Sequence, residues 1–250
     1  MTNEEKALGQ KIESYRSQIP AEHGRDAVLS YGSPKANTFT VDSASGHAQP
    51  GHANNSSVEA TLKTGSNIQK GILLKRIVEA ANSRRILELG TNTGFSGAYF
   101  ISGNQAYLTT IEGSEELCVI ARKNLSRISD QFNVINAFFD EAIDELVQQG
   151  ARFDTVFIDG QHEEEATLHY AKRVAPLMTD DALFIFDDIY WSRGMNNAWK
   201  RLIAEFNFSE GADLFTVGLL RGNSTNDTDK TTIYDLGEVL PRPDFSRGDW

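Results

Sequence analysis

Residues 84–96 of the chain read RRILELGTNTGFS. A strand is expected at Arg85–Leu89, a short run that is apolar apart from Arg85 and Glu88, as is typical of a parallel strand covered on both faces. Gly90 and Gly94 bracket a turn in which the backbone can bend sharply and approach a ligand closely. The stretch therefore predicts a strand, a glycine turn and a helix start, and open α/β sheets bind nucleotides at such strand ends.

Strand-like and helix-like segments alternate downstream of this stretch, which predicts βαβ units. The expected strands are Ala106–Ile111, Asn133–Ala137, Thr155–Ile158 and Ala182–Phe186, and the expected helices are Glu115–Arg127, Glu141–Gln149, Glu163–Ala175 and Asn196–Phe206. A terminal hairpin is expected from residues 213–220 and 231–234, which flank a polar turn. The fold class predicted is α/β, with a Rossmann-like, doubly wound, mostly parallel seven-stranded sheet.

The N-terminal part of the chain has a different composition. Residues 4–19 carry apolar side chains at spacings of three and four, which predicts a helix, and residues 67–81 do the same. Between them, residues 31–57 are rich in Gly, Ser, Asn, Pro and His, which is typical of a loop. We predict an N-terminal extension, residues 1–65. Its loop, Tyr31–Ser57, is expected to close together with Tyr190 and Trp191 over the substrate side of the ligand crevice; a disordered linker is the alternative. Residues 66–250 form the main predicted domain.

Composition limits the function classes. The chain has 250 residues, 40% of them hydrophobic, which suffices for a core. A formal net charge of −11 argues against nucleic acid and against an anionic membrane as partners. The single cysteine, Cys118, excludes an intramolecular disulfide. Because neither a signal peptide nor a membrane-spanning stretch is apparent, we expect a cytoplasmic protein.

Two further features indicate which ligand binds. They are the spacing of the glycines and the residues after the next two strands. The turn reads G-x-x-x-G rather than G-x-G-x-x-G, which disfavours a dinucleotide. Glu112, 22 residues after Gly90, can accept hydrogen bonds from both hydroxyls of a ribose, although an acidic residue at a helix start is also common. Ala137 and Phe138 lie at the end of the third strand, at the level of a bound base, where an aromatic side chain belongs to the core at least as often.

Acidic residues also follow the fourth and fifth strands. Asp159 ends one strand, and Asp187 and Asp188 end the next. Converging carboxylates repel unless a cation or proton lies between them, and all-oxygen ligands favour Mg²⁺, Mn²⁺ or Ca²⁺. The alternative is that these aspartates cap the following segment. His162, three residues after Asp159, is a candidate general base, although a lone histidine is usually a surface residue.

These motifs together resemble class I methyltransferases dependent on S-adenosylmethionine (SAM), in particular small bacterial O-methyltransferases related to catechol O-methyltransferase. The resemblance covers roughly residues 67–234. It implies that Asp159, Asp187 and Asp188 hold a metal and that Glu112 holds the ribose of SAM. The full set of SAM-binding residues that we predict is Glu88, Gly90, Thr91, Asn92, Gly94, Ser96, Glu112, Ala137, Phe138 and Asp159, with His162 and Asp159 as catalytic residues.

The chain departs from the family pattern at two positions. Asp188 stands where the family has asparagine, and His162 stands where it has the lysine that acts as base. The resemblance predicts a SAM-dependent methyltransferase that O-methylates a small hydroxylated or carboxylated metabolite, with Mg²⁺ assistance left open. The alternatives are a metal-independent N- or C-methyltransferase and a non-catalytic SAM-binding module. The expected partner is a small-molecule acceptor, and a homodimer is left open.

Overall fold

The computed structural model describes residues 1–23, 27–32, 39–103, 105–222 and 231–235. The chain forms two compact units. Unit 1 comprises Met1–Tyr31 and Ala53–Ala142, and unit 2 comprises Gly32–His52 and Ile143–Trp250. The sequence predicts a domain boundary between residues 65 and 66, which differs from this division into units. The predicted domain boundary stays a prediction.

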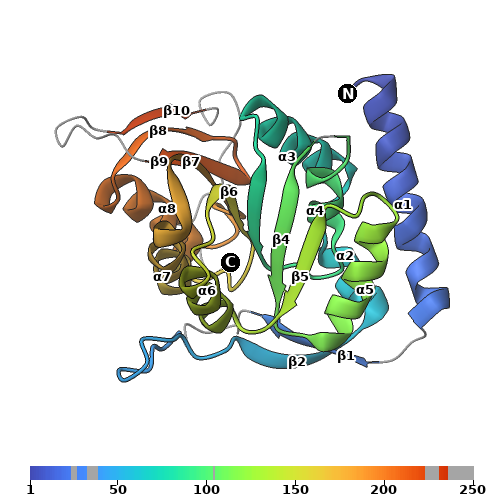
Figure 1. Ribbon diagram of the computed structural model, residues 1–250, viewed down its shortest axis with the longest axis horizontal. Coiled ribbons are helices and arrows are strands. Elements are labelled where there is room, and N and C mark those ends of the chain that lie inside the picture. The colour runs from blue at the N-terminus through green and yellow to red at the C-terminus, as the bar shows by residue number, and fades with distance from the viewer. Residues whose placement is uncertain (24–26, 33–38, 104, 223–230, 236–250) are drawn as a thin grey trace. The chain divides into compact units, whose positions relative to one another are not determined.

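Helices cover the strands of unit 1. The helices are α1 (Asn3–His23), α2 (Val58–Thr64), α3 (Ile68–Ala80), α4 (Phe95–Phe100) and α5 (Glu115–Ser126), and α6 (Phe139–Gln148) begins at its end. In α1, Ile12 and Ile19 are buried, and this face packs against α2, α3 and α5 (Figure 1). Arg16 in α1 donates to the carbonyl oxygens of Leu62 and Ser66, both at 2.5 Å. The N-terminal helix is therefore an integral part of unit 1.

Three parallel strands form the core of unit 1. They are β3 (Arg85–Leu89), β4 (Tyr107–Glu112) and β5 (Phe132–Asn136), with β4 between the other two. The register pairs Glu88 with Thr110, and Glu112 with Asn136. Because parallel strands end at the same edge of a sheet, the polar residues that follow β3, β4 and β5 gather there.

Five further strands belong to unit 2, in the order β10-β8-β9-β7-β6. The strands are β6 (Phe153–Ile158), β7 (Met178–Asp187), β8 (Phe208–Asp213), β9 (Val217–Gly222) and β10 (Thr232–Asp235); the helices are α7 (Glu164–Val174), the short 3-10 helix η1 (Ala175–Leu177) and α8 (Arg193–Glu205). Strands β6 and β7 are parallel, and β9 runs antiparallel to both β7 and β8. Helices α7 and α8 pack against each other.

The mostly parallel α/β sheet predicted from the sequence is confirmed, with corrections at its end. The sheet has eight strands rather than seven, because β10 pairs in parallel with β8. The predicted terminal hairpin was wrong: residues 213–220 span the turn between β8 and β9, and these two strands form the hairpin. Asp213 closes that turn by accepting from the Phe215 backbone N–H at 3.0 Å. The predicted polar turn after Gly222 lies outside the described residues.

The predicted loop of residues 31–57 also needs a correction. Its last part, His52–Ser57, is strand β2, which pairs with β1 (Ala27–Gly32) in a separate two-stranded sheet. A polar sequence can form such a strand because backbone groups, not side chains, make the ladder. Residues 33–38 lie outside the described part of the chain. Among the described residues, no helix combines the length and the apolar character needed to cross a bilayer.

Candidate active site

The glycine turn in unit 1 has the backbone conformation that its sequence requires. Gly90 and Gly94 have φ of 103° and 81°, in the left-handed region that glycine tolerates. Asn92 between them also has a positive φ, 50°. At Gly94 an added Cβ would lie 3.2 Å from the Cα of Ala121 in α5. This position therefore requires glycine both for conformation and for space.

Glu112 fixes the turn from the neighbouring strand. Its carboxylate accepts from the Asn92 backbone N–H at 2.9 Å and from the Ser114 backbone N–H at 3.0 Å. Only 8% of the residue is exposed, and burial raises the pKa of Glu112 while the backbone N–H donors oppose that rise. Glu112 thus lies where the sequence predicts a ribose-binding carboxylate, at the end of β4 and beside the glycine turn.

Glu88 is buried at the end of β3 rather than exposed to a ligand. It is fully buried, and it accepts hydrogen bonds from the hydroxyls of Ser96 at 2.5 Å and Thr110 at 2.6 Å. The Thr110 hydroxyl also lies 2.5 Å from that of Thr91. The structure therefore places Glu88, Thr91 and Ser96 in a polar network behind the turn, and their contact with a cofactor stays a prediction.

Phe138 and a residue from the N-terminal region pack together in unit 1. The rings of Phe138 and Tyr31 meet edge to face, with centroids 5.0 Å apart. Gly113 lies beneath them, since an added Cβ would be 3.1 Å from Tyr31 and 3.2 Å from Phe138. The Ala137 backbone N–H donates to the Glu112 carbonyl at 3.2 Å. Sequence reasoning missed Tyr31, because nothing near it in the chain marks the contact.

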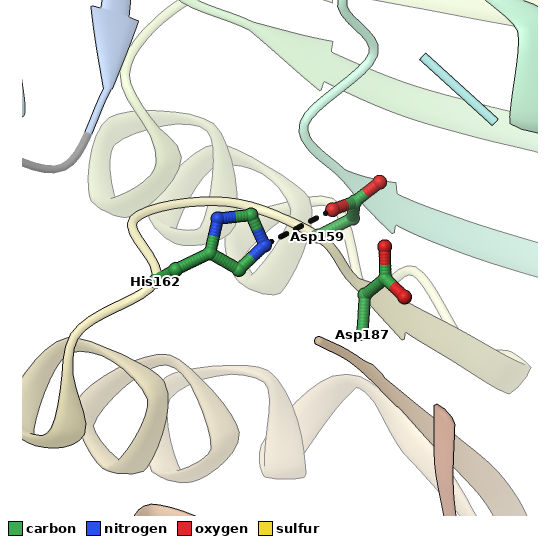
Figure 2. Close-up of side chains that lie close together, drawn as sticks. All are labelled: Asp159, His162 and Asp187. Atoms are coloured by element: carbon green, nitrogen blue, oxygen red, sulfur yellow. Dashed lines mark hydrogen bonds and ion pairs between the residues drawn. The ribbon is translucent and has the colours of Figure 1, made fainter. Parts of the chain in front are cut away.

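A second polar cluster lies in unit 2, at the ends of two neighbouring strands. The register pairs Ile158 of β6 with Phe186 of β7, so the next residues, Asp159 and Asp187, lie side by side at the ends of these strands. Oxygen atoms of these two carboxylates and a ring nitrogen of His162 all lie within 4.8 Å of one another. Figure 2 shows the three side chains pointing toward one another. Asp187 is 1% exposed, which makes its carboxylate the most deeply buried part of the cluster.

His162 is held by hydrogen bonding from its own turn. Its Nε2 lies 3.2 Å from Asp159 Oδ1 (dashed in Figure 2) and 3.7 Å from Asp188 Oδ2. The exposed ring of Trp191 lies beside the imidazole, with centroids 5.5 Å apart. The imidazole is therefore oriented by a carboxylate and is only partly covered, an arrangement suited to proton transfer.

The predicted metal ligands are brought together only in part. Asp159 and Asp187 converge, but the third member of the cluster is His162, while Asp188 contacts the imidazole. Asp188 has a positive φ of 52°, so its backbone leaves the strand geometry that Asp187 still has. The assignment of Asp188 as a ligand stays a prediction.

The two aromatic residues expected to cover the acceptor site differ in position. Tyr190 donates to Asp213 at 2.8 Å and stacks on Phe215, in the turn between β8 and β9. Trp191 alone lies beside His162.

Part of the chain is similar in sequence to known proteins. Residues 87–189 match a family model described as a methyltransferase domain. A stretch of 125 residues is 31% identical to the catechol O-methyltransferase of Mycobacterium tuberculosis (strain ATCC 25618 / H37Rv). The resemblance to class I O-methyltransferases is confirmed. The match covers 46% of this chain and 56% of that enzyme, so the chain spans little more than half the length of this curated relative.

Solved O-methyltransferases share the fold. An O-methyltransferase from Bacillus cereus in complex with SAH matches 85% of this chain and 100% of its own, with a TM-score of 0.57 and 18% identity. The O-methyltransferase TomG from Streptomyces achromogenes, in complex with SAM, matches 64% of this chain and 82% of its own, with a TM-score of 0.55 and 18% identity. At these identities the likeness shows that the fold is shared and nothing further.

Proposed function

We propose that this chain is a SAM-dependent O-methyltransferase acting on a small hydroxylated or carboxylated acceptor. The observation that carries the proposal is His162 held by Asp159 at 3.2 Å beside the buried Asp187, within the residues that match a methyltransferase domain. The match to catechol O-methyltransferase supports oxygen as the atom that is methylated.

In unit 1, the residues proposed to bind SAM are those of the glycine turn and Glu112. The glycines at positions 90 and 94 carry no side chain to keep a ligand from the backbone, and Glu112 would offer carboxylate oxygens to the ribose hydroxyls. The ring of Phe138 is proposed to cover the adenine. SAM would supply a methyl group made electrophilic by the sulfonium.

In unit 2, His162 is proposed to accept the acceptor's hydroxyl proton. The C–O bond forms as the C–S bond breaks, and the proton moves to the imidazole, so that the products are SAH and a methyl ether or ester. Asp159 keeps the ring oriented and stabilises the imidazolium that forms. Trp191, 57% exposed beside the imidazole, is proposed as a wall for the acceptor.

The direct test measures SAH formation. Purified protein is incubated with SAM and a panel of phenols, carboxylic acids and amines, and SAH and methylated products are quantified by mass spectrometry. We expect products methylated on oxygen only. Products from amines alone would favour the N-methyltransferase reading, and SAM binding without any product would favour the non-catalytic module.

A change at Glu112 tests the cofactor site. Glu112→Ala removes the acceptor of the Asn92 and Ser114 backbone N–H groups and the proposed ribose contact. We expect SAH affinity, measured by calorimetry, to fall about tenfold to a hundredfold, the scale of about 1–3 kcal/mol for a deleted polar partner. Glu116→Ala is the matched control, since Glu116 is exposed and accepts a hydrogen bond from the Ser114 hydroxyl and not from the glycine turn. Equal affinity in both variants would contradict the assignment.

A divalent cation fits the cluster in unit 2, although not in the all-oxygen form that the sequence predicts. Two carboxylates and an imidazole, with their ligand atoms within 4.8 Å, are a donor set for cations that accept nitrogen, such as Mn²⁺, more than for Mg²⁺. Asp159, His162 and Asp187 would hold the ion. When bound, it would lower the pKa of an acceptor hydroxyl, and His162 would then serve as a ligand and not as the base.

Cation binding has its own expected outcome. We expect calorimetry to show tighter binding of Mn²⁺ than of Mg²⁺, by about tenfold or more, and His162→Ala to abolish that preference. Mg²⁺ binding that is unaffected by His162→Ala would support the all-oxygen set with Asp188. If neither ion binds, methyl transfer rests on His162 as the base without a metal.

A further inference from the structure

A segment of unit 2 far from His162 in the sequence reaches the turn that carries it. This segment, residues 39–49, is here called the brace. The Phe39 backbone N–H donates to Glu163 Oε2 at 3.2 Å, and the side-chain amide of Gln161 donates to the Gln49 carbonyl at 3.5 Å. The two contacts flank His162 on either side in the sequence.

The brace has a defined structure of its own. Val41 pairs with Ala48 in an isolated antiparallel bridge, and the Gln49 backbone N–H donates to the Thr40 carbonyl at 2.8 Å. At its tip, the Asp42 carboxylate accepts from the backbone N–H of Ser45 at 2.8 Å. Backbone and hydroxyl donors from Ser45 lower the pKa of Asp42. The brace is thus a small hairpin-like loop with a fixed shape, which can hold the segments that it contacts in place.

Helices α6 and α7 anchor the brace. The ring of Phe39 packs against those of His169, with centroids 5.4 Å apart, and Tyr170, at 6.5 Å. His47 Nε2 lies 2.7 Å from the Asp144 carboxylate in α6, which also bonds to Arg173 in α7. These contacts hold the brace independently of the turn that carries His162.

The turn itself needs such support. Gln161 has a φ of 44°, a left-handed conformation that is unfavourable for a residue with a side chain. Its amide is fixed at both ends, because Tyr170 donates its hydroxyl to Gln161 Oε1 at 2.7 Å while the nitrogen donates to Gln49. A strained backbone conformation persists where surrounding contacts hold it in place, and these two hydrogen bonds hold Gln161 in place.

We propose that the brace positions His162 for proton transfer, with Gln161 and Glu163 as positioning residues that link the two. This inference rests on the proposed function, since it takes His162 as the base. A shift of about 1 Å in a reacting group can lower a rate a hundredfold, so contacts on both flanks of the imidazole bear directly on turnover.

The test changes each side of the contact. Phe39→Ala removes the ring that anchors the brace, and Glu163→Ala removes the carboxylate that accepts the Phe39 backbone N–H. We expect both variants to lower kcat about tenfold, to keep SAH affinity within about twofold, and to speed hydrogen exchange at residues 160–163. Glu163→Gln should retain most of the kcat, because its amide oxygen can still accept. Val41→Ala, which trims an exposed side chain of the brace and leaves its backbone bridge to Ala48 in place, is the control and should leave kcat and exchange unchanged.

Exchange separates this inference from the proposed function. Unchanged exchange at residues 160–163 in both Phe39→Ala and Glu163→Ala would overturn the brace, and so would faster exchange with unchanged kcat. A wild-type protein that binds SAH but methylates nothing would instead refute the proposed function. A Glu163→Gln variant as impaired as Glu163→Ala would also count against the brace, because the contact needs an oxygen acceptor and not a charge.

Discussion

Replacing His162 with alanine is expected to lower kcat about 10²–10⁴-fold while SAH affinity stays within about twofold. The reason is the position of the imidazole, whose Nε2 lies 3.2 Å from Asp159 in unit 2, whereas the glycine turn and Glu112 belong to unit 1. Removing a general base affects the chemical step, whereas the glycine turn and Glu112, which are proposed to bind the cofactor, are left unchanged. Steady-state kinetics and calorimetry measure the two quantities.

Two further variants sharpen this test. Asp188→Asn removes the charge from the longer contact, 3.7 Å from Nε2, and should change kcat less than about threefold. His162→Lys places the family's amine at this position and should restore part of the lost turnover at higher pH, because a lysine must be deprotonated to act as base. Turnover within about threefold of wild type in His162→Ala would refute the general base.

Much of the fold could be predicted from local patterns. Strand β3 was placed at its observed bounds, because Ile86, Leu87 and Leu89 form an apolar run that ends at a glycine. The hairpin of β8 and β9 was misplaced for an equally local reason. Residues 213–220 look like one strand, and the turn at Leu214–Thr216 carries no glycine or proline to mark it. Strand β2 is polar and has no apolar alternation to reveal it.

The site could be predicted where strand ends determine it. Glu112, Asp159 and Asp187 lie where parallel strands end, and this follows from topology. Contacts between distant segments could not be predicted. The bond from Phe39 to Glu163 joins residues 124 positions apart, and no pattern in either segment points to the other. The cluster contains His162 and not Asp188, whose backbone is left-handed, and the sequence does not reveal that angle.

Replacing Gly94 with alanine is expected to abolish measurable SAH binding and to destabilise unit 1. Its φ of 81° is costly for alanine, on the order of 1–2 kcal/mol. The added Cβ would also lie 3.2 Å from the Cα and 3.3 Å from the carbonyl oxygen of Ala121, so the turn or helix α5 must shift. Any shift displaces Asn92, whose backbone N–H is bound to Glu112. Denaturant unfolding and calorimetry measure the two effects.

Gly103→Ala is the matched control. Gly103 lies in the same unit with a φ of 75°, but an added Cβ there meets nothing within 4 Å. It should therefore lose stability through conformation alone and keep SAH affinity. The difference between the two variants isolates the packing of the turn against α5, and equal SAH affinities would contradict it. Adding Ala121→Gly to Gly94→Ala should recover little, because two of the three nearest atoms belong to the backbone of Ala121 and remain in place.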